Sequence, residues 1–300
     1  MHGREEARAS IMRGDYQIVP LANGSATLFS ASYGEKMHPG LGPAAEAELL
    51  YVRQLKIRER LEQHKGEFVI WDVGLGGAAN ALAALRATRD VAGKLRLISF
   101  DNTVEPLELA LKNCIALGYV ANYEKVLTSL LRDRSATFNN GSLEVHWEFI
   151  MGDFPGWLAR FAGANGESGS ADPSNSHNAE GSDNSSRIAV APHAIFYDAF
   201  SPAKNPAMWT LPLFANLFRA LDPGRPCALT TYSRSTMIRA SLLLAGFFVG
   251  MGHATGMKEE TTIAANSLDL ISEPLDARWL ARASRSDSAE RRRRASHPGP

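Results

Sequence analysis

One acidic residue in the second half of the chain stands among polar and aromatic side chains. Asp198 directly follows the apolar segment 194–197, and Lys204, Asn205 and Trp209 come shortly after it. Ligands of open α/β sheets bind at the carboxyl ends of the strands, so Asp198 is a candidate to bind or deprotonate a substrate. The simpler alternative is that Asp198 only caps a loop, because Asp is common in turns.

A glycine-rich turn forms a second candidate site. The apolar segment 68–73, which contains Asp72, runs into Gly74-Leu-Gly76-Gly and then into a helix of small residues that contains Asn80. Such a turn lets the backbone approach a ligand closely. The spacing is not Gly-x-Gly-x-x-Gly, which argues against the pyrophosphate of a dinucleotide.

Two further acids follow predicted strands. Asp101 comes after the strand 95–100, at the position where an acid that binds ribose is expected, and Asp153 comes after the strand 143–149. Because the carboxyl ends of parallel strands meet at one edge of a sheet, we expect these acids, the glycine turn and Asp198 to share one site.

The hydrophobic pattern predicts an α/β fold with a mainly parallel sheet, an antiparallel edge pair, and an N-terminal hairpin and helix. The expected strands are 16–20, 25–30, 68–73, 95–100, 143–149, 193–197, 225–231, 247–251 and 261–266, and the expected helices are 43–61, 78–88, 105–117, 154–162, 208–221 and 234–245. Residues 33–39 are expected to form a loop. We divide the chain into an N-terminal extension (1–65), a main domain (66–272) and a basic, flexible tail (273–300). Within the main domain, a Gly/Ser/Asn-rich insertion (163–187) is expected to be disordered.

Composition excludes several classes of protein. The chain has 300 residues, of which 45% are hydrophobic, and equal numbers of basic and acidic residues, so no overall charge attracts a polyanion. No apolar run approaches the ~20 residues that span a bilayer, and the N-terminus lacks the core of a signal peptide. We therefore expect a cytoplasmic protein without a membrane partner. The two cysteines and eight histidines show no metal-ligand spacing, so no metal is expected.

These segments together resemble a known family. The string Asp198-Ala-Phe-Ser-Pro-Ala-Lys204-Asn205-Pro-Ala-Met-Trp209, the glycine turn, Asp101 and Gly-Asp153 are similar to S-adenosylmethionine-dependent tRNA methyltransferases that complete 5-methylaminomethyl-(2-thio)uridine at the wobble position. The similarity runs from about residue 16 to residue 271 and includes a Gly-Glu35-x-Met-His-Pro loop. Members often read Thr-Gly where this chain has Gly77-Ala78. In many bacteria this enzyme is the N-terminal half of a bifunctional protein.

The resemblance implies a Rossmann-like class I methyltransferase fold, S-adenosylmethionine as the cofactor, and the anticodon of tRNA as the partner. It implies that Asp198 orients the substrate amine and handles its proton, and that a cofactor site contains Asp72, Gly74, Gly76, Asn80, Asp101 and Asp153. Asp101 would bind the ribose and Asp153 the adenine. A separate flavin-dependent oxidoreductase would supply the aminomethyl substrate.

The substrate contacts are expected from Glu35, Lys204, Asn205, Trp209 and Lys258. Trp209 is either a core anchor or a platform on which the base stacks, and His38 is either a loop histidine or a residue that faces the amine. Two rival functions stay open: methylation of a small amine by the same fold, and a binding module without catalysis.

Overall fold

The computed structural model describes residues 14–167, 190–254 and 259–285. Within them, eight strands form one sheet in the order β10-β11-β9-β8-β4-β5-β7-β6. The strands are β4 (Glu67–Val73), β5 (Gly93–Asp101), β6 (Ser135–Asn140), β7 (Leu143–Met151), β8 (Ala194–Tyr197), β9 (Ala228–Thr231), β10 (Phe248–Gly252) and β11 (Thr261–Ala265). The five strands from β9 to β7 run parallel, and the predicted antiparallel pair β10–β11 stands at one edge. The predicted fold class is confirmed.

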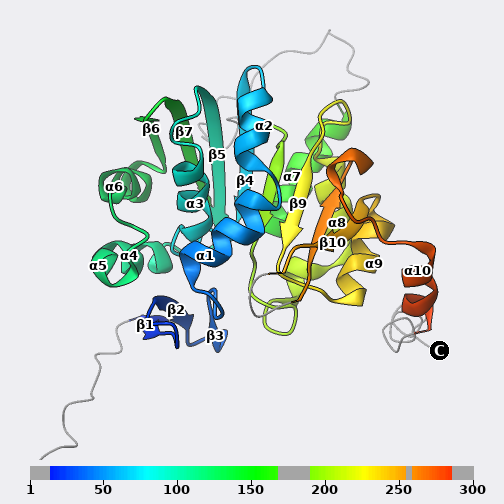
Figure 1. Ribbon diagram of the computed structural model, residues 1–300, viewed down its shortest axis with the longest axis horizontal. Coiled ribbons are helices and arrows are strands. Elements are labelled where there is room, and N and C mark those ends of the chain that lie inside the picture. Colours follow the sequence, from blue (N-terminus) through cyan, green and yellow to red (C-terminus); the bar gives the residue numbers. More distant parts are fainter. Residues whose placement is uncertain (1–13, 168–189, 255–258, 286–300) are drawn as a thin grey trace, which may run out of the picture.

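Helices cover both faces of this sheet (Figure 1). They are α1 (Pro43–Ala47), α2 (Ile57–Gln63), α3 (Ala79–Ala87), α4 (Glu105–Lys112), α5 (Cys114–Leu117), α6 (Glu124–Asp133), α7 (Phe154–Glu167), α8 (Leu211–Arg219), α9 (Thr236–Ala245) and α10 (Ala277–Ser284). Successive side chains of a strand point to opposite faces. In β4, Phe68 and Ile70 therefore pack in one core with α1 to α3 and α6, whereas Val69 and Trp71 pack in a second core with α7 to α9.

The topology of the sheet indicates the edge at which a ligand is expected to bind. From β4 the sheet grows to one side through β5 and β7 and to the other through β8 and β9, so the strand order changes direction between β4 and β8. Ligands of open α/β sheets bind at such a switch point, beyond the carboxyl ends of the strands. A small antiparallel sheet of β1 (Tyr16–Pro20), β2 (Ala26–Ser30) and β3 (Glu35–Lys36) lies at this edge (Figure 1).

The structure differs from the sequence prediction near the N-terminus. The predicted loop 33–39 contains β3. The predicted helix 43–61 is interrupted by a π-helical segment, η2 (Glu48–Arg53), and by Lys56, whose φ is +50°. Three consecutive residues of η2, Leu50 to Val52, are buried, which is more than the apolar stripe of a regular α-helix places against a core.

Two other predicted helices are divided by local hydrogen bonds. The helix 105–117 breaks at Asn113, whose side chain donates to the carbonyl of Leu109 and so competes with the helical pattern. The helix 208–221 is a 3-10 turn, η4 (Pro206–Trp209), followed by α8. Thr210 separates them because its hydroxyl accepts from the amide of Leu213 and caps α8.

Several other elements also differ from the sequence prediction. Helix α6 and strand β6 were not predicted; β6 is a largely polar strand that pairs only with β7, so it lacks the apolar pattern of a buried strand. Helix α7 continues to Glu167, so residues 163–167 of the predicted disordered insertion are helical, and residues 168–187 of it lie outside the described ranges. Helix α10 lies in the predicted flexible tail.

Candidate active site

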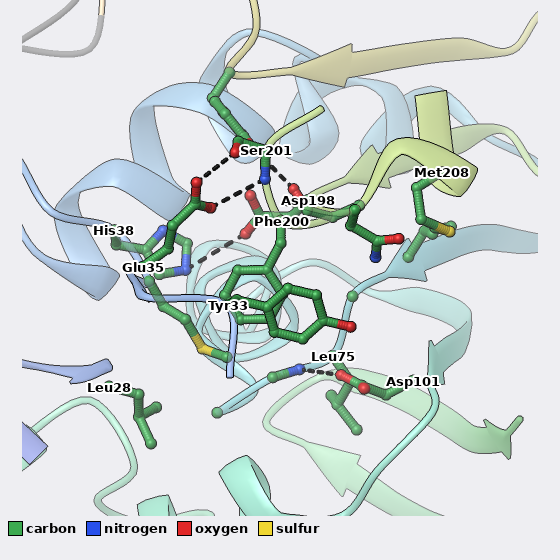
Figure 2. Close-up of a pocket in the computed structure, with 18 of the residues that line it drawn as sticks. Leu28, Tyr33, Glu35, His38, Leu75, Asp101, Asp198, Phe200, Ser201 and Met208 are labelled. Atoms are coloured by element: carbon green, nitrogen blue, oxygen red, sulfur yellow. Dashed lines mark hydrogen bonds and ion pairs between the residues drawn. The ribbon is translucent and has the colours of Figure 1, made fainter. Parts of the chain in front are cut away.

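A cavity of about 650 Å³ opens at the carboxyl ends of β4, β5, β7 and β8. The turns after these strands form one wall, and residues 33–40 of the N-terminal segment form the opposite wall. We call the region around Asp101, Asp153 and the glycine turn the Asp101 end, and the region around Asp198 the Asp198 end. Figure 2 shows Tyr33 and Phe200 between the two.

The glycine turn connects β4 to α3. Gly74 has a φ of +96°, and a Cβ atom there would lie 2.6 Å from the carbonyl oxygen of Asp198. Only glycine therefore fits where the ends of β4 and β8 meet. Gly76 and Ala78 also have positive φ values, +49° and +66°, and turn the chain into the helix. Gly74 and Gly76 both line the cavity, as predicted.

Asp101 fastens the end of β5 to this turn. Its Oδ2 accepts a hydrogen bond from the amide of Gly76 at 2.8 Å, and its Oδ1 accepts one from the amide of Asn102 at 2.8 Å. Burial raises the pKa of Asp101 above its ordinary value, against these hydrogen bonds, which lower it. Asp101 lines the cavity, so the structure brings together the turn and the acid that the sequence paired.

Asp153 stands at the same end after β7. Its Oδ2 accepts from the amide of Gly156 at 2.8 Å, which caps the first turn of α7. Asp153 is exposed and lines the cavity beside Gly152 and Phe154. Asp153 therefore caps α7 and also presents a carboxylate to the cavity.

Side chains from two other segments contact the Asp198 carboxylate at the end of β8. Its Oδ2 accepts from Asn80 Nδ2 at 2.8 Å, and His38 Nε2 lies 3.5 Å from the same oxygen. The buried hydroxyl of Tyr51 donates to the carbonyl of Tyr197, next to Asp198, at 3.5 Å. Burial, and then the charge of Asp198, raise the pKa of Tyr51 so that it stays neutral. The Asp198 side chain is 17% exposed and lines the cavity.

Asn80 and Asp72 lie behind the cavity wall. Both are buried, and neither lines the cavity, although the sequence placed them among cofactor contacts. Asn80 reaches the site through its hydrogen bond to Asp198. Asp72 accepts from the hydroxyl of Ser99 at 2.8 Å, and burial raises its pKa to about 8, with a smaller contribution from the charges of Asp198 and Asp101.

Glu35 binds the loop after β8 rather than pointing freely into the site. Its two carboxylate oxygens accept from the amide of Ser201, at 3.1 Å, and from the hydroxyl of the same residue. Beside this contact the ring of Tyr33 stacks on Phe200, with centroids 4.1 Å apart (Figure 2). These contacts join the N-terminal segment to the Asp198 loop across the cavity.

The remaining predicted substrate residues are dispersed. Asn205 lines the cavity, whereas Lys204 is exposed and does not. A Cβ atom at Gly34 would lie 3.6 Å from Lys204 Nζ, so this ammonium lies close to Gly34. Trp209 is only 4% exposed, and its indole donates to the carbonyl of Phe200 at 2.8 Å; it is the core anchor of the two alternatives. Lys258 lies outside the described residues.

Several lining residues were missed by sequence reasoning. Phe200 and Ser201 lie inside the string after Asp198 and could have been inferred from it. Tyr33 and Tyr232 carry no local signal, because their places depend on packing between distant segments; the hydroxyl of Tyr232 donates to the carbonyl of Ala199 at 2.9 Å.

Two classes of feature were sought in the described part of the chain. No helix there is long and apolar enough to cross a membrane. The same residues contain no group of three or more His, Cys, Asp and Glu side chains arranged to hold a metal ion.

Known proteins are similar to this chain, including the segment that carries Asp198. Residues 183–267, which include Asp198 and its loop, match the model of a family described as S-adenosyl-L-methionine-dependent methyltransferase. The tRNA 5-methylaminomethyl-2-thiouridine biosynthesis bifunctional protein MnmC of Aeromonas hydrophila is 26% identical over 272 residues, covering 87% of this chain and 37% of that protein. The protein of the same name from Ectopseudomonas mendocina is 39% identical over 89 residues, covering 30% of this chain and 13% of the relative. The chain thus spans about a third of the length of the curated relatives that match most of it.

Solved structures share the fold. MnmC2 from Aquifex aeolicus superposes with a TM-score of 0.62 at 23% identity, covering 92% of this chain and 77% of that one. A spermidine synthase in complex with the transition-state analogue AdoDATO gives a TM-score of 0.51 at 10% identity, covering 90% and 76%. At these identities the structures establish the Rossmann-like fold alone. Residues 183–267 are thus similar to the S-adenosyl-L-methionine-dependent methyltransferase family, and proteins of the MnmC type match most of the chain at 26–27% identity.

Proposed function

We propose that this chain transfers a methyl group from S-adenosylmethionine to the amine of 5-aminomethyl-(2-thio)uridine at the wobble position of tRNA, giving 5-methylaminomethyl-(2-thio)uridine. The observation that carries the proposal is the placement of Asp198 at the switch point of the sheet, inside the segment that matches the methyltransferase family. The names of the full-length relatives supply the substrate.

The residues at the Asp101 end fit the cofactor. Carboxylates at Asp101 and Asp153 can accept hydrogen bonds from ribose hydroxyls and from the adenine amino group, and the apolar side chains of Leu75, Phe100 and Phe154 line the same end. Gly76 leaves open a space in which a Cβ atom would lie only 3.2 Å from the sulfur of Met37. We assign Asp101 to the ribose, Asp153 to the adenine, and the Gly74 and Gly76 backbone to the rest of the cofactor.

The charges that line the cavity suit a cationic reaction partner. Acidic side chains line both ends, at Glu35, Glu46, Asp101, Asp153 and Asp198, whereas Lys36 is the one lysine or arginine in the described lining. An alkylammonium is therefore attracted to the Asp198 end before it loses its proton. Bound S-adenosylmethionine supplies a methyl group that is electrophilic because it is attached to a sulfonium.

Asp198 performs the step that the amine requires. An ammonium has no lone pair, so a proton must leave the nitrogen before or as the nitrogen–carbon bond forms. Asp198 accepts a hydrogen bond from the amine, takes this proton and orients the lone pair for in-line displacement. The buried Asn80, which donates to Asp198 Oδ2 at 2.8 Å, fixes the carboxylate for that purpose. Rigid placement of this kind favours the reacting geometry.

We further propose that tRNA is the macromolecular partner and that a separate flavin-dependent oxidoreductase supplies the aminomethyl group. The wobble base would leave the anticodon stack to enter the cavity. Lys36, Lys204, Lys258 and the arginine-rich C-terminus are the basic residues assigned to the tRNA backbone. Such an enzyme acts in the cytoplasm, where its substrate is found.

Methylation of isolated tRNA tests this function. The full chain is incubated with S-adenosylmethionine and with tRNA from cells that lack the protein, and the nucleosides are analysed by mass spectrometry. We expect 5-aminomethyl-(2-thio)uridine to gain one methyl group, and matched tRNA without the aminomethyl arm to stay unmodified.

The same assay separates the rival functions. Methylation of free alkylamines as readily as of tRNA would identify a small-molecule methyltransferase. Binding of S-adenosylhomocysteine without methylation of either substrate would identify a binding module.

A further inference from the structure

His38 occupies a position that the proposed reaction does not yet use. Its imidazole lies between two carboxylates: Nε2 is 3.5 Å from Asp198 Oδ2, and Nδ1 is 3.9 Å from Glu46 Oε2. The side chain is 12% exposed and lines the cavity. Figure 2 shows it at the Asp198 end, on the side that faces Glu35.

The carboxylate of Glu46, which lies near His38 Nδ1, is itself held in place. Glu46 lies in α1, and its Oε1 accepts from the amides of Gly40 at 2.6 Å and Leu41 at 2.9 Å. The loop that carries His38 is therefore bound to the first turn of α1. A carboxylate near Nδ1 favours the imidazole form with the proton on Nδ1 and thereby leaves Nε2 to exchange a proton with Asp198.

The backbone of His38 supports a functional role. Its φ is +52°, in the left-handed region. This conformation is uncommon for residues other than glycine, although Asn, Asp and His adopt it more readily than most. Here it brings the imidazole between Asp198 and Glu46.

We propose that His38 is a positioning residue that orients Asp198 and receives from it the proton that Asp198 takes from the substrate. This inference rests on the proposed function. The nitrogen–hydrogen bond of the ammonium breaks, and its electron pair stays on nitrogen as the proton passes to the Asp198 carboxylate. The proton then moves to His38 Nε2, and the imidazolium is stabilised by Glu46. The nitrogen lone pair forms the new bond to carbon while the electrons of the carbon–sulfur bond go to sulfur.

Other ionisable groups near this pair do not compete for the role. Tyr51 and Tyr232 both have pKa values raised by burial, so they stay neutral. The carboxylate of Glu35 is engaged with Ser201. Of the groups around Asp198 in the described structure, His38 lines the cavity and has an imidazole nitrogen, Nε2, that faces the carboxylate and can accept a proton.

Single-turnover methylation with His38→Asn and His38→Gly tests the proposal, because Asn and Gly both tolerate a left-handed backbone. With saturating enzyme and cofactor, we expect each variant to lose at least about tenfold in rate and to bind S-adenosylhomocysteine within about twofold of wild type. Added imidazole should restore a large part of the rate of His38→Gly. The matched control is His146→Asn, because His146 also contacts a carboxylate, Glu148 Oε1 at 2.8 Å, but lies on β7 and does not line the cavity.

The outcomes separate this inference from the function on which it rests. Wild-type rates in His38→Asn, or a slow His38→Gly that imidazole does not rescue, would overturn the relay and leave the methyltransferase function standing. If the wild type methylates no tRNA, the proposed function fails, and the pair is tested in the free protein. There the melting-temperature shifts of His38→Asn and Asp198→Asn should be non-additive in the double variant; additive shifts would refute the coupling.

Discussion

The two ends of the cavity are built in different ways. The Asp101 end is built around a glycine turn, in which the amide of Gly76 donates to the Asp101 carboxylate. The Asp198 end is made of side chains from distant segments, with Asn80, Tyr51 and His38 around Asp198 and with Glu35 on Ser201. Substitutions at the first end should therefore act through stability and cofactor affinity, and those at the second through the rate of reaction. Gly74 touches both ends.

The largest effect is expected from Gly74→Ala. The new Cβ atom would lie 2.6 Å from the Asp198 carbonyl oxygen, in a backbone conformation with φ +96°. We expect the free energy of unfolding to fall by roughly 3 kcal/mol or more, because a backbone clash adds to the strain of a left-handed residue. Chemical denaturation measures it. Gly163→Ala is the control: it lies in α7 with nothing within 4 Å of the new atom, so it should be neutral or stabilising. Equal behaviour of the two variants would show that the strand ends do not constrain each other.

Asp198→Asn should distinguish the roles of the two ends most clearly. We expect the single-turnover rate of methyl transfer to fall on the order of 100-fold or more, the scale of a positioned acid–base group. The affinity for S-adenosylhomocysteine, measured by calorimetry, should stay close to wild type, since Asp198 lies at the other end from the assigned cofactor contacts. A mutant that reacts at the wild-type rate would reduce Asp198 to a loop residue.

Asp101→Ala is the reciprocal test. Loss of a charge-assisted hydrogen-bond acceptor should weaken binding of S-adenosylhomocysteine by roughly 1–3 kcal/mol. The single-turnover rate at saturating cofactor should change less than the affinity does. Unchanged affinity would remove Asp101 from the cofactor site and leave it a structural role through the backbone amides that it accepts.

The buried acid between the two ends predicts a pH dependence. Burial raises the pKa of Asp72 to about 8, above the ordinary value of 3.8, so between these values the folded state holds a proton that the unfolded state has lost. Stability contributed by Asp72 is thus present at low pH and declines as the pH rises toward 8, by at most about 1.4 kcal/mol per pH unit. Asp72→Asn, whose amide can still accept from Ser99, should lose this dependence. Parallel curves of stability against pH for the two proteins would contradict it.

The smallest effect is expected from Ala78→Gly. Ala78 has a left-handed φ of +66°. Relief of this strain should roughly offset the added entropy of glycine, so stability should change by less than about 0.5 kcal/mol. Ala81→Gly is the matched control, because Ala81 is also fully buried but lies inside α3. It should cost about 1 kcal/mol or more, and equal losses in the two variants would show that Ala78 carries no strain.

The sequence predicted the site residues at the strand ends but not the contacts between distant segments. The glycine turn, Asp101, Asp153 and Asp198 each follow a short apolar strand directly, and strand ends of a parallel sheet must meet, so the sequence predicts their convergence. The contacts of Glu35 and His38 join residues more than 150 positions apart and depend on how the small sheet packs. The predicted helix 43–61 fails for a related reason: η2 is shaped by the core it buries, not by its own residue preferences.

Nucleoside mass spectrometry of tRNA from cells without this protein tests the central claim most directly. The account predicts that 5-aminomethyl-(2-thio)uridine or its carboxymethylaminomethyl precursor accumulates at the wobble position. Re-expression of the wild-type chain should restore the 5-methylaminomethyl nucleoside, and Asp198→Asn should not. A normal nucleoside profile in the deficient cells would contradict the account.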